Sequence, residues 1–337
     1  MLSVIIPTLN EADSIRRLLD QLARQASIEL EILVVDGGST DTTVQIAHDA
    51  NAQVIEAASG RGAQMNKAVE VATGDYLLFL HADTRLSRDN QLDAALREIQ
   101  QEAEPVAGHF KLNFHTDDQE LKAQLRFFEE KSRLNRPGTW SGDQGLLISA
   151  ETLRHYDGFW QDLPFLEDKE FGRKFLLSGR FITFDSTLTT SGRRFEREGF
   201  RERMTVNAII MTMFHLGHRG FFADAAGLYR LNQDSSRLDP LPFLRLAIDE
   251  LFGGRIRDAF VNLYRLSRYA AGNFWQIILA FGIRNDRIDA YLTTYDRYIR
   301  PWSDHALGHL ILMPVLVTWI YWELFRLSYS RRSNYSR

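Results

Sequence analysis

The chain has 337 residues, of which 45% are hydrophobic and 25% charged, and its formal net charge is -4. This is the composition of an ordinary globular protein, and it excludes a wholly disordered chain or one that crosses a membrane many times. The absence of cysteine excludes disulfides, thiolate zinc sites and a cysteine nucleophile, and the negative net charge argues against nucleic acid as a partner.

Four short apolar runs in the first eighty residues are typical of strands buried in a sheet. They occupy residues 2–6, 30–35, 53–55 and 76–80. The segments between them place apolar residues at helical spacing, and Asn10 is the predicted N-cap of the first helix. This alternation of strand and helix predicts an α/β fold with a doubly wound, mostly parallel sheet.

The sequence pattern changes after about residue 200. From there to the C-terminus, helical segments rich in arginine, leucine and aromatic residues follow one another without a convincing strand. We therefore predict an α/β domain over residues 1–218 and a helical extension over residues 219–337. The extension is expected either to associate with a membrane or to dimerise.

Polar side chains gather where the predicted strands end. Glu11 follows the first strand, Asp36 closes the second, and His81 and Asp83 follow the fourth. Because ligands of open α/β sheets bind outside the carboxyl ends of the strands, we expect a binding site at this edge. With no thiolate available, a metal there would be held by carboxylates, imidazoles or carbonyls, which favours a hard ion such as Mg²⁺ or Mn²⁺.

Six motifs spread over the first two hundred residues together resemble family 2 of the glycosyltransferases. They are SVIIPTLNE, ILVVDGGSTD, GRGAQMN, LLFLHADTRL, GDQG and FLEDKE. GRGAQMN, HAD and TTSGRRFE in combination further resemble a bacterial subgroup called "transferase 2", for which the resemblance supplies no acceptor. The resemblance implies a GT-A type fold over residues 1–218 and a nucleoside diphosphate sugar as the donor.

The resemblance also implies a set of nucleotide-binding residues: Pro7, Leu9, Glu11, Asp36, Ser39, Arg61 and Ala82. Asp36 stands at a strand end before small residues, so we expect it to accept the imide N–H of a flat base, while Glu11 takes the ribose or the base edge. Arg61, between two glycines at a helix start, can meet the diphosphate. The alternative for Asp36 is a turn-forming or helix-capping aspartate.

The segment His81-Ala82-Asp83 resembles the metal motif of the family, aspartate-any-aspartate, with histidine in the first position. Asp83 is expected to bind a divalent cation, Mn²⁺ or Mg²⁺, which would neutralise the departing diphosphate. His81 can bind the cation, contact the phosphate or do neither. The alternative for His81 is a hydrogen-bonded histidine at a strand end.

Two acidic or amide pairs later in the chain are candidates for the sugar-transfer step. Glu167 and Asp168 resemble the Glu-Asp motif of the family, and we expect Asp168 to be the base, since inverting transfer needs a carboxylate within reach of the incoming hydroxyl. The pair can also simply complement a helix dipole. Asp143 and Gln144 lie in a glycine-bounded loop and are expected to face the donor sugar or the acceptor, with a plain β-turn as the alternative.

Arg193 and Arg194 stand where the family-like part of the sequence ends. Two adjacent arginines cannot lie on one face of a regular element, so at most one of them is expected to reach the diphosphate. The alternative is a solvated charge cluster.

Taken with the resemblance, these residues predict a metal-dependent, inverting glycosyltransferase. It would move a sugar from a nucleoside diphosphate sugar, with uridine diphosphate preferred, to an unidentified hydroxyl or phosphate acceptor. The alternatives are a sugar nucleotidyltransferase, which would be expected to carry a glycine-rich, lysine-containing loop where this chain has TLNEAD, and a non-catalytic nucleotide-sugar-binding or membrane-scaffold protein.

The last apolar run, residues 310–322, is about thirteen residues long and contains Pro314. That is shorter than the roughly 20 residues needed to span a bilayer, so we expect an interfacial or re-entrant helix, or else a buried helix or dimer contact. The N-terminus lacks the charged region and long apolar core of a signal peptide. The catalytic part is therefore expected in the cytoplasm, peripheral on the cytoplasmic face of the membrane.

Overall fold

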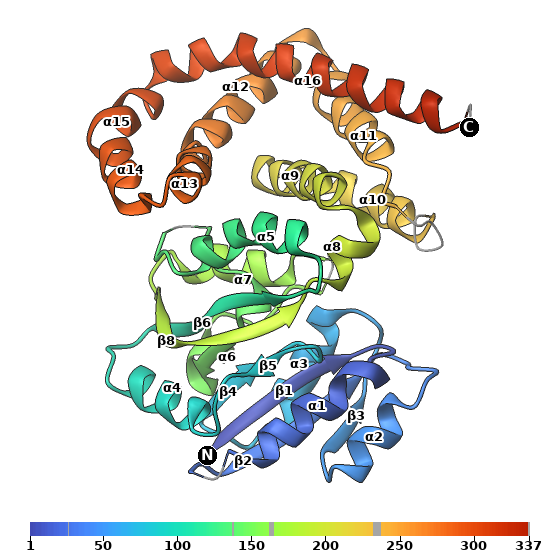
Figure 1. The fold of residues 1–337 in the computed structure, drawn as a ribbon, viewed down its shortest axis with the longest axis vertical. Coiled ribbons are helices and arrows are strands. Elements are labelled where there is room, and N and C mark those ends of the chain that lie inside the picture. Colours follow the sequence, from blue (N-terminus) through green and yellow to red (C-terminus); the bar gives the residue numbers. More distant parts are fainter. Residues whose placement is uncertain (26, 137, 162–164, 232–236, 336–337) are drawn as a thin grey trace. The chain divides into compact units, whose positions relative to one another are not determined.

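A computed structural model describes residues 1–25, 27–136, 138–161, 165–231 and 237–335. Two compact units make up the chain, Met1–Gly192 and Arg193–Arg337, and each is considered by itself (Figure 1). The first unit holds the sheet and the second is helical in its described residues. The units thus divide earlier in the sequence than the domain boundary that we predict after residue 218, and that boundary stays a prediction.

Eight strands form one mixed sheet in the first unit. They are β1 (Leu2–Thr8), β2 (Leu30–Asp36), β3 (Gln53–Glu56), β4 (Tyr76–Phe79), β5 (Arg85–Leu86), β6 (Val106–His115), β7 (Leu146–Ser149) and β8 (Arg180–Ser191), in the order β3-β2-β1-β4-β7-β6-β8-β5. The first four strands are parallel, β7 is antiparallel to both of its neighbours, and β8 is parallel to β6. The carboxyl ends of β1, β2 and β4 therefore meet at one edge, where the loop ahead of β7 also arrives.

Helices cover both faces of this sheet and bury two apolar layers. One layer joins the strands to α1 (Ala12–Ala23), α2 (Thr43–Asp49) and α4 (Gln91–Gln100), and the other joins them to α3 (Arg61–Val71), α6 (Ala150–His155) and α7 (Glu167–Phe175). A further helix of this unit, α5, spans Gln119–Ser132. Apolar side chains at helical spacing drive this packing, since each helix buries one stripe against the pleated strands.

The four predicted strands are confirmed at β1 to β4, and the helix after β1 buries the expected apolar face. The predicted cap is wrong, because α1 begins at Ala12 with Glu11 as its N-cap. Asn10 instead has a φ of 55° and its side-chain oxygen accepts a 2.8 Å hydrogen bond from the Thr40 backbone N–H. Asn10 thus ties the loop after β1 to the loop after β2.

The second unit consists of helices in the part that the structure describes. They are α8 (Arg193–Glu198), α9 (Phe200–Leu216), α10 (Gly220–Leu231), α11 (Leu241–Phe252), α12 (Ile256–Gly272), α13 (Trp275–Arg284), α14 (Ile288–Thr294), the π-helical turn η2 (Tyr295–Ile299), α15 (Arg300–Ser303) and α16 (Ala306–Tyr335). Among the described residues, one stretch is long and apolar enough to cross a membrane, Ala306–Tyr329 in α16. The helix is continuous through Pro314, and this stretch of 24 residues exceeds the roughly 20 needed to span a bilayer, whereas the apolar run recognised in the sequence has about thirteen.

Candidate active site

Asp36 ends β2 beside Thr8 of β1, and its carboxylate is held by the turn that follows it. Oδ2 accepts hydrogen bonds from the backbone N–H groups of Gly38 (3.0 Å) and Ser39 (2.8 Å). Oδ1 accepts from the hydroxyls of Ser39 (2.5 Å) and Thr8 (3.2 Å). Four donors from the protein thus surround a side chain that is only 5% exposed.

Burial raises the pKa of the Asp36 carboxyl, but the hydrogen bonds from Ser39, Gly38 and Thr8 outweigh it and lower the pKa below its ordinary value of 3.8. The group is therefore a fixed anion at neutral pH. This geometry supports the turn-forming role that the sequence left open. It does not support the predicted contact with a base, because the lone pairs are already engaged.

The other predicted nucleotide residues of the first two loops lie near this turn. Glu11 is half-buried and its backbone N–H donates to Thr43 Oγ1 (2.8 Å). The Ser39 hydroxyl also accepts from the backbone N–H of Asn10 (2.8 Å). Pro7 is half-buried and Leu9 exposed. The loops after β1 and β2 are thus hydrogen-bonded into one surface.

The motif GRGAQMN lies at the start of α3, and its residues differ in exposure and in the contacts that they make. Arg61 is exposed, while Gly62 packs so closely that a Cβ there would lie 2.4 Å from the Trp160 carbonyl oxygen. The buried Gln64 amide donates to the carbonyls of Thr8 (2.8 Å) and Val35 (2.7 Å), which clamps the ends of β1 and β2. Sequence reasoning used this motif for Arg61 only and missed the clamp.

Asn66 completes the motif by binding a loop from much later in the chain. Its amide donates to the Phe159 carbonyl (2.7 Å) and accepts from the Phe159 N–H (2.9 Å). The motif thus joins the first strand loops to the segment just ahead of α7.

His81 follows β4 and contacts the loop ahead of β7. Its Nδ1 lies 2.9 Å from Asp143 Oδ1, and a Cβ at Gly142 would lie 3.3 Å from its Nε2. Asp83, two residues further on, accepts a long hydrogen bond from the Thr190 hydroxyl (3.4 Å). Ala82 between them is buried.

Asp168 meets the same loop from the first turn of α7. Its Oδ2 accepts a hydrogen bond from the Gly142 N–H (2.9 Å), and a Cβ at Gly142 would lie 3.6 Å from this oxygen. Gly142 is therefore bordered by His81 on one side and Asp168 on the other. The structure brings together His81, Asp143 and Asp168, which are predicted site residues from three separate parts of the sequence.

The start of α7 has an unusual backbone. Leu166, the N-cap, has a φ of 73°, in the left-handed region that costs a side-chain-bearing residue roughly 1–2 kcal/mol. Such conformations persist only where the surroundings fix them, and they concentrate at functional sites. Here the conformation immediately precedes Glu167 and Asp168.

Glu167 is buried beside Asp168. Burial raises the pKa of the Glu167 carboxyl and the Asp168 charge raises it further, while Arg61 and His81 oppose the shift. Arg61, Glu167 and His81 therefore share one electrostatic environment. Gly62 contributes to this arrangement, since a Cβ at that position would lie 3.4 Å from the Glu167 side chain.

Lys169 brings a positive charge to the site that sequence reasoning missed. Its Nζ lies 4.0 Å from Asp168 Oδ2, donates a hydrogen bond to the Trp140 carbonyl and sits 5.7 Å from the centre of the Trp140 ring. Burial and the Lys169 charge lower the pKa of Lys131 to about 8. Lys169 lies inside the motif FLEDKE, but its position beside Trp140 depends on packing that the motif does not reveal.

Gln144 lies inside the protein and is 1% exposed. Its amide N–H groups donate to His109 Nδ1 (2.9 Å) and to the Phe110 carbonyl (3.3 Å), while its oxygen accepts from the Ser141 N–H (3.0 Å). These bonds hold residues 141–145 in place. They do not support the predicted contact of Gln144 with a sugar or acceptor, whereas the Asp143 side chain is half exposed.

His109, on β6, is the buried partner that the sequence did not reveal. Since Nδ1 accepts from Gln144, the ring proton lies on Nε2, 3.3 Å from Thr183 Oγ1. Burial lowers the pKa of His109 to about 4, with the Phe110 carbonyl opposing the shift and the Lys169 charge adding to it. The imidazole is therefore neutral at neutral pH.

Arg193 and Arg194 open α8 in the second unit. Arg194 Nε lies 3.3 Å from Glu198 Oε1 in the same helix, and the Arg194 side chain is half exposed while that of Glu198 is largely buried. Their predicted contact with the diphosphate would join the two units, so it stays a prediction.

A cation at this site would have few protein ligands. Among the residues that the structure describes, no group of three or more histidine, aspartate or glutamate side chains could hold a metal ion. Mg²⁺ is usually bound by one or two carboxylates together with substrate phosphates and water. Asp83 fits that donor set, with the remaining positions left to a diphosphate and water, whereas the His81 imidazole is not one of these oxygen donors.

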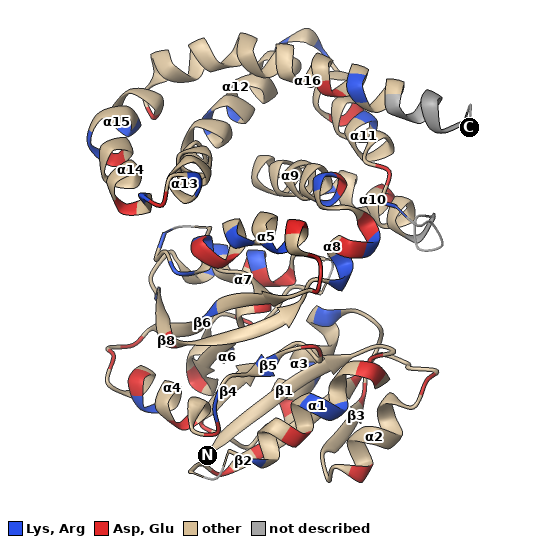
Figure 2. Cartoon of the chain, in the orientation of Figure 1, with Lys and Arg blue, Asp and Glu red and all other residues tan. Residues whose placement is uncertain are grey.

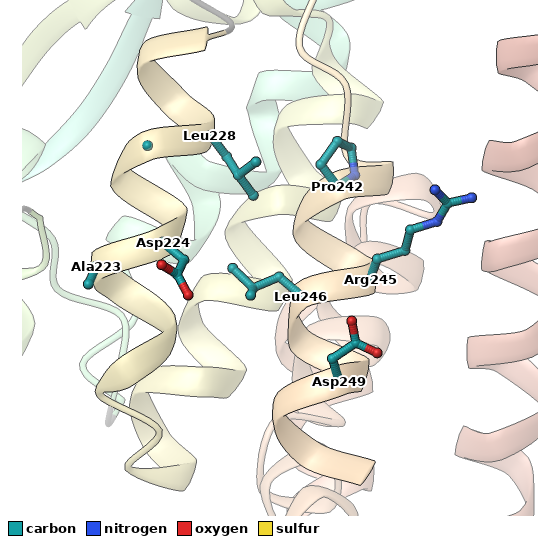
Figure 3. A pocket seen from close by; sticks show the side chains of 8 residues that line it. Ala223, Asp224, Leu228, Pro242, Arg245, Leu246 and Asp249 are labelled. Carbon is teal, nitrogen blue, oxygen red and sulfur yellow. The ribbon is translucent and has the colours of Figure 1, made fainter. Parts of the chain in front are cut away.

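A hollow of about 770 Å³ lies in the second unit, between α10 and α11 (Figure 3). Leu228 from α10 and Leu246 from α11 point into the space between these helices. The remaining lining residues are Ala223, Asp224, Gly227, Pro242, Arg245 and Asp249. None of them is a predicted site residue, so the candidate active site is defined by the chemistry around Gly142 instead.

Residues 3–155 match the family model described as glycosyl transferase family 2. The match covers less than half of the chain and lies within the first unit. Together with the mixed, mostly parallel sheet, the match confirms the predicted GT-A type fold and the predicted resemblance. The family that these residues match is one of the predicted enzyme class, the glycosyltransferases.

Curated relatives match about a quarter of the chain. A PGL/p-HBAD biosynthesis glycosyltransferase of Mycobacterium bovis is 43% identical over 93 residues, which are 26% of this chain and 36% of that protein. The poly(ribitol-phosphate) beta-N-acetylglucosaminyltransferase TarS of Staphylococcus aureus is 35% identical over 102 residues, 28% of this chain and 18% of that protein. The matched part thus covers about a third or less of each relative.

Solved structures with low sequence identity are also similar to this chain. The S. aureus TarS fragment 1-349 in complex with UDP is 20% identical, with a TM-score of 0.48 over 88% of this chain and 90% of that one. The mannosyltransferase PcManGT of Pyrobaculum calidifontis, in complex with GDP-Man and Mn²⁺, is 20% identical, with a TM-score of 0.48 over 90% of this chain and 86% of that one.

Proposed function

We propose that the family 2 domain transfers a sugar from a nucleoside diphosphate sugar, preferably a uridine one, to a hydroxyl or phosphate acceptor with inversion at the anomeric carbon. The transfer depends on a divalent cation, Mn²⁺ or Mg²⁺. The observation that carries the proposal is the meeting of His81, Asp143 and Asp168 around Gly142, with distances of 2.9 Å from His81 to Asp143 and from Gly142 to Asp168. These groups lie at the edge of the sheet where α/β enzymes bind their ligands.

The nucleotide would lie on the surface formed by the loops after β1 and β2. Asp36 shapes this surface through the turn at Gly38 and Ser39, while Glu11, Pro7 and Leu9 would contribute its walls. Ala82, whose side chain is buried, would face the nucleotide through its backbone. Arg61, exposed at the start of α3, would face the diphosphate, where a guanidinium and a helix N-terminus both favour an anion. One of Arg193 and Arg194 would add a second positive charge.

Asp83 and His81 would hold the cation together with the diphosphate. When bound, the cation would neutralise the negative charge that develops on the leaving group. Asp143 keeps His81 oriented through the contact at Nδ1. Its half-exposed carboxylate would also be available to the sugar or the acceptor.

Asp168 would act as the base. As the acceptor oxygen forms a bond to the anomeric carbon, its proton passes to Asp168, and the bond from that carbon to the phosphate oxygen breaks with its electron pair leaving on the diphosphate. The Gly142 N–H, 2.9 Å from Oδ2, and the Lys169 ammonium, 4.0 Å from it, would hold this carboxylate in position. Glu167, whose pKa is raised, would form the buried wall behind Asp168.

A thermal-shift screen tests the donor class, because a ligand that binds only the folded state raises the melting temperature. Uridine, guanosine and thymidine diphosphate sugars would each be added with and without Mn²⁺. We expect the largest shift with a uridine diphosphate sugar and Mn²⁺, and release of the free nucleoside diphosphate on turnover. Formation of a sugar nucleotide and pyrophosphate from a sugar phosphate and a nucleoside triphosphate would establish the nucleotidyltransferase alternative instead.

The non-catalytic alternative predicts a different result in the same assay. Donor binding without release of nucleoside diphosphate, with every acceptor and metal tried, would identify a nucleotide-sugar-binding or scaffold protein. The anomeric configuration of the product, read by NMR against the donor, tests inversion.

A further inference from the structure

The long helix α16 has its polarity reversed relative to a helix on the surface of a soluble protein. Its exposed positions recur at helical spacing and are almost all apolar or aromatic: Leu307, Leu310, Ile311, Pro314, Val315, Thr318, Trp319, Tyr321, Trp322, Phe325 and Tyr329. Its buried positions include the polar residues His309 and Glu323. An apolar face turned outward over more than five turns is far larger than the patches that soluble monomers expose.

This exposed face offers almost no hydrogen-bonding group to water. The Thr318 hydroxyl is engaged within the helix, where it donates to the Pro314 carbonyl (2.9 Å). The single acid between residues 306 and 325, Glu323, is buried and paired with Arg326. In Figure 2, α16 is accordingly tan over most of its length. The remaining polar atoms belong to tryptophan and tyrosine rings, which favour membrane–water interfaces.

Neighbouring helices of the same unit add further exposed apolar side chains. Ile256 (90% exposed) and Phe260 project from α12, Ile277 and Phe281 from α13, and Trp302 from α15. Within each of α12 and α13 the pair is four residues apart, so it lies on one face of the helix. Exposed apolar side chains thus occur on several helices of the second unit.

The charge of this part of the chain indicates what covers the surface. Residues 255–337 contain twelve arginines and six acids, a formal charge of +6, whereas the whole chain carries -4, so residues 1–254 carry -10. The arginines of α12 to α15 are exposed. Two copies that paired through this part would bring like charges together, but an anionic lipid surface would attract it.

We propose that α16 and the exposed apolar residues of α12, α13 and α15 dock the protein on the surface of an anionic lipid bilayer. The helix lies in the plane of the interface and does not cross the bilayer. Its inner face remains packed on α12, where the His309 and Tyr264 rings are 5.9 Å apart, and α12 carries the exposed Arg265 and Arg268. Crossing would draw these arginines into the hydrocarbon at a cost of roughly 3 kcal/mol each.

Flotation of the full-length protein with lipid vesicles tests this docking. We expect the protein to float with vesicles that contain phosphatidylglycerol, more weakly with vesicles of phosphatidylcholine alone, and less at high salt. The double variant Ile311→Glu/Trp322→Glu replaces residues that are 70% and 58% exposed, and it should lower vesicle partitioning at least roughly tenfold. A control is Leu177→Glu, which places one such charge on an exposed leucine of the first unit and should change nothing.

A second pair of variants separates the charge contribution from the apolar one. Arg297→Gln and Arg300→Gln should each weaken partitioning to anionic vesicles roughly fivefold and leave the weak binding to neutral vesicles unchanged. Release of nucleoside diphosphate from a soluble donor should be the same in all these variants, so a failure of docking and a failure of the proposed activity can be told apart. Circular dichroism confirms that each variant is folded.

Two outcomes would overturn the proposal. The first is a failure of vesicle binding to depend on the apolar face: the full-length protein does not float with anionic vesicles at low salt, or the double variant floats as well as the unaltered protein. The other is a dimer in analytical ultracentrifugation that Ile311→Glu/Trp322→Glu dissociates, without any vesicle binding, which would assign the surface to a second copy of this chain.

Discussion

Two carboxylates at the same edge of the sheet, Asp36 at the end of β2 and Asp168 in the first turn of α7, have different surroundings. Asp36 accepts four hydrogen bonds from its own surroundings. Asp168 has one bond to the Gly142 N–H, one to its own helix and a lysine 4.0 Å away. The number of engaged lone pairs thus distinguishes a carboxylate that holds the backbone from one with capacity to take a proton.

Replacing the less engaged carboxylate is expected to have the largest effect. Asp168→Asn keeps the size of the side chain and removes its basicity, so kcat with a hydroxyl acceptor should fall on the order of 10²- to 10⁴-fold while donor affinity stays nearly constant. Initial rates and nucleotide titrations on the same preparation measure both quantities. Asp185→Asn, an exposed aspartate on β8 paired with Lys111, is the control. Loss of donor binding with normal turnover per bound donor would make Asp168 a binding residue.

Asp83 extends the comparison to a carboxylate with a single long hydrogen bond to Thr190. Asp83→Asn should reduce metal-dependent turnover on the order of 10²-fold, because a direct ligand contributes several kcal/mol of charge stabilisation, and should leave the melting temperature almost unchanged. Rates measured over a Mn²⁺ titration check this. Asp89→Asn, at an exposed site beside Arg24, serves as the matched variant. An unaltered metal dependence in Asp83→Asn would contradict the assignment.

The stability contributed by His109 and that contributed by Asp36 should be lost at different pH as the solution is acidified. His109 has its folded pKa lowered to about 4 from 6.5, so the stability that it contributes as a neutral ring is complete above pH 6.5 and is lost as the pH falls toward 4. The loss is on the order of 3 kcal/mol of unfolding free energy. Asp36, with a pKa lowered from 3.8, contributes stability that is lost only below that value.

Urea unfolding between pH 7 and 4 measures this loss. His109→Asn keeps an acceptor for Gln144 and removes the titrating ring, so its stability should decline less over that range. Equal acid sensitivity in His109→Asn and the unaltered protein would show that other groups control the loss.

The smallest effect is expected at the fully engaged carboxylate. Asp36→Asn should weaken nucleotide binding about tenfold, because it loosens the turn at Gly38 and Ser39. If the carboxylate acts through the turn, calorimetry should give the same loss for uridine and guanosine diphosphates. A loss confined to uridine diphosphate would restore direct recognition of the base by Asp36.

Part of the fold could be predicted from the sequence because β1 to β4 are short apolar runs buried on both faces. Strands β6 and β8 escaped notice because polar residues interrupt them: β6 includes the buried His109, and β8 alternates threonine and serine with apolar residues. Strand β7 has four residues and is antiparallel to its neighbours, which no local pattern indicates.

The candidate site could be predicted as a set of residues but not as a set of contacts. His81, Asp143 and Asp168 carry their motifs, whereas the distances that join them depend on β4, the loop ahead of β7 and α7 meeting at one edge. Gln144 was expected to face a ligand because a glycine-bounded loop gives no sign of the buried His109 that binds it. The prediction of Asn10 as a helix cap is wrong for a similar reason: its side-chain oxygen accepts a hydrogen bond from Thr40 in the neighbouring loop.

The left-handed backbone at Leu166 has a consequence for anyone who redesigns this protein for robustness. A method that optimises folding alone would place glycine there, since glycine adopts a φ of 73° without the steric cost that leucine bears. Glycine would also widen the set of orientations open to the first turn of α7, including that of Asp168. We therefore expect Leu166→Gly to raise the melting temperature and to lower the catalytic rate. This residue should be kept fixed during such redesign.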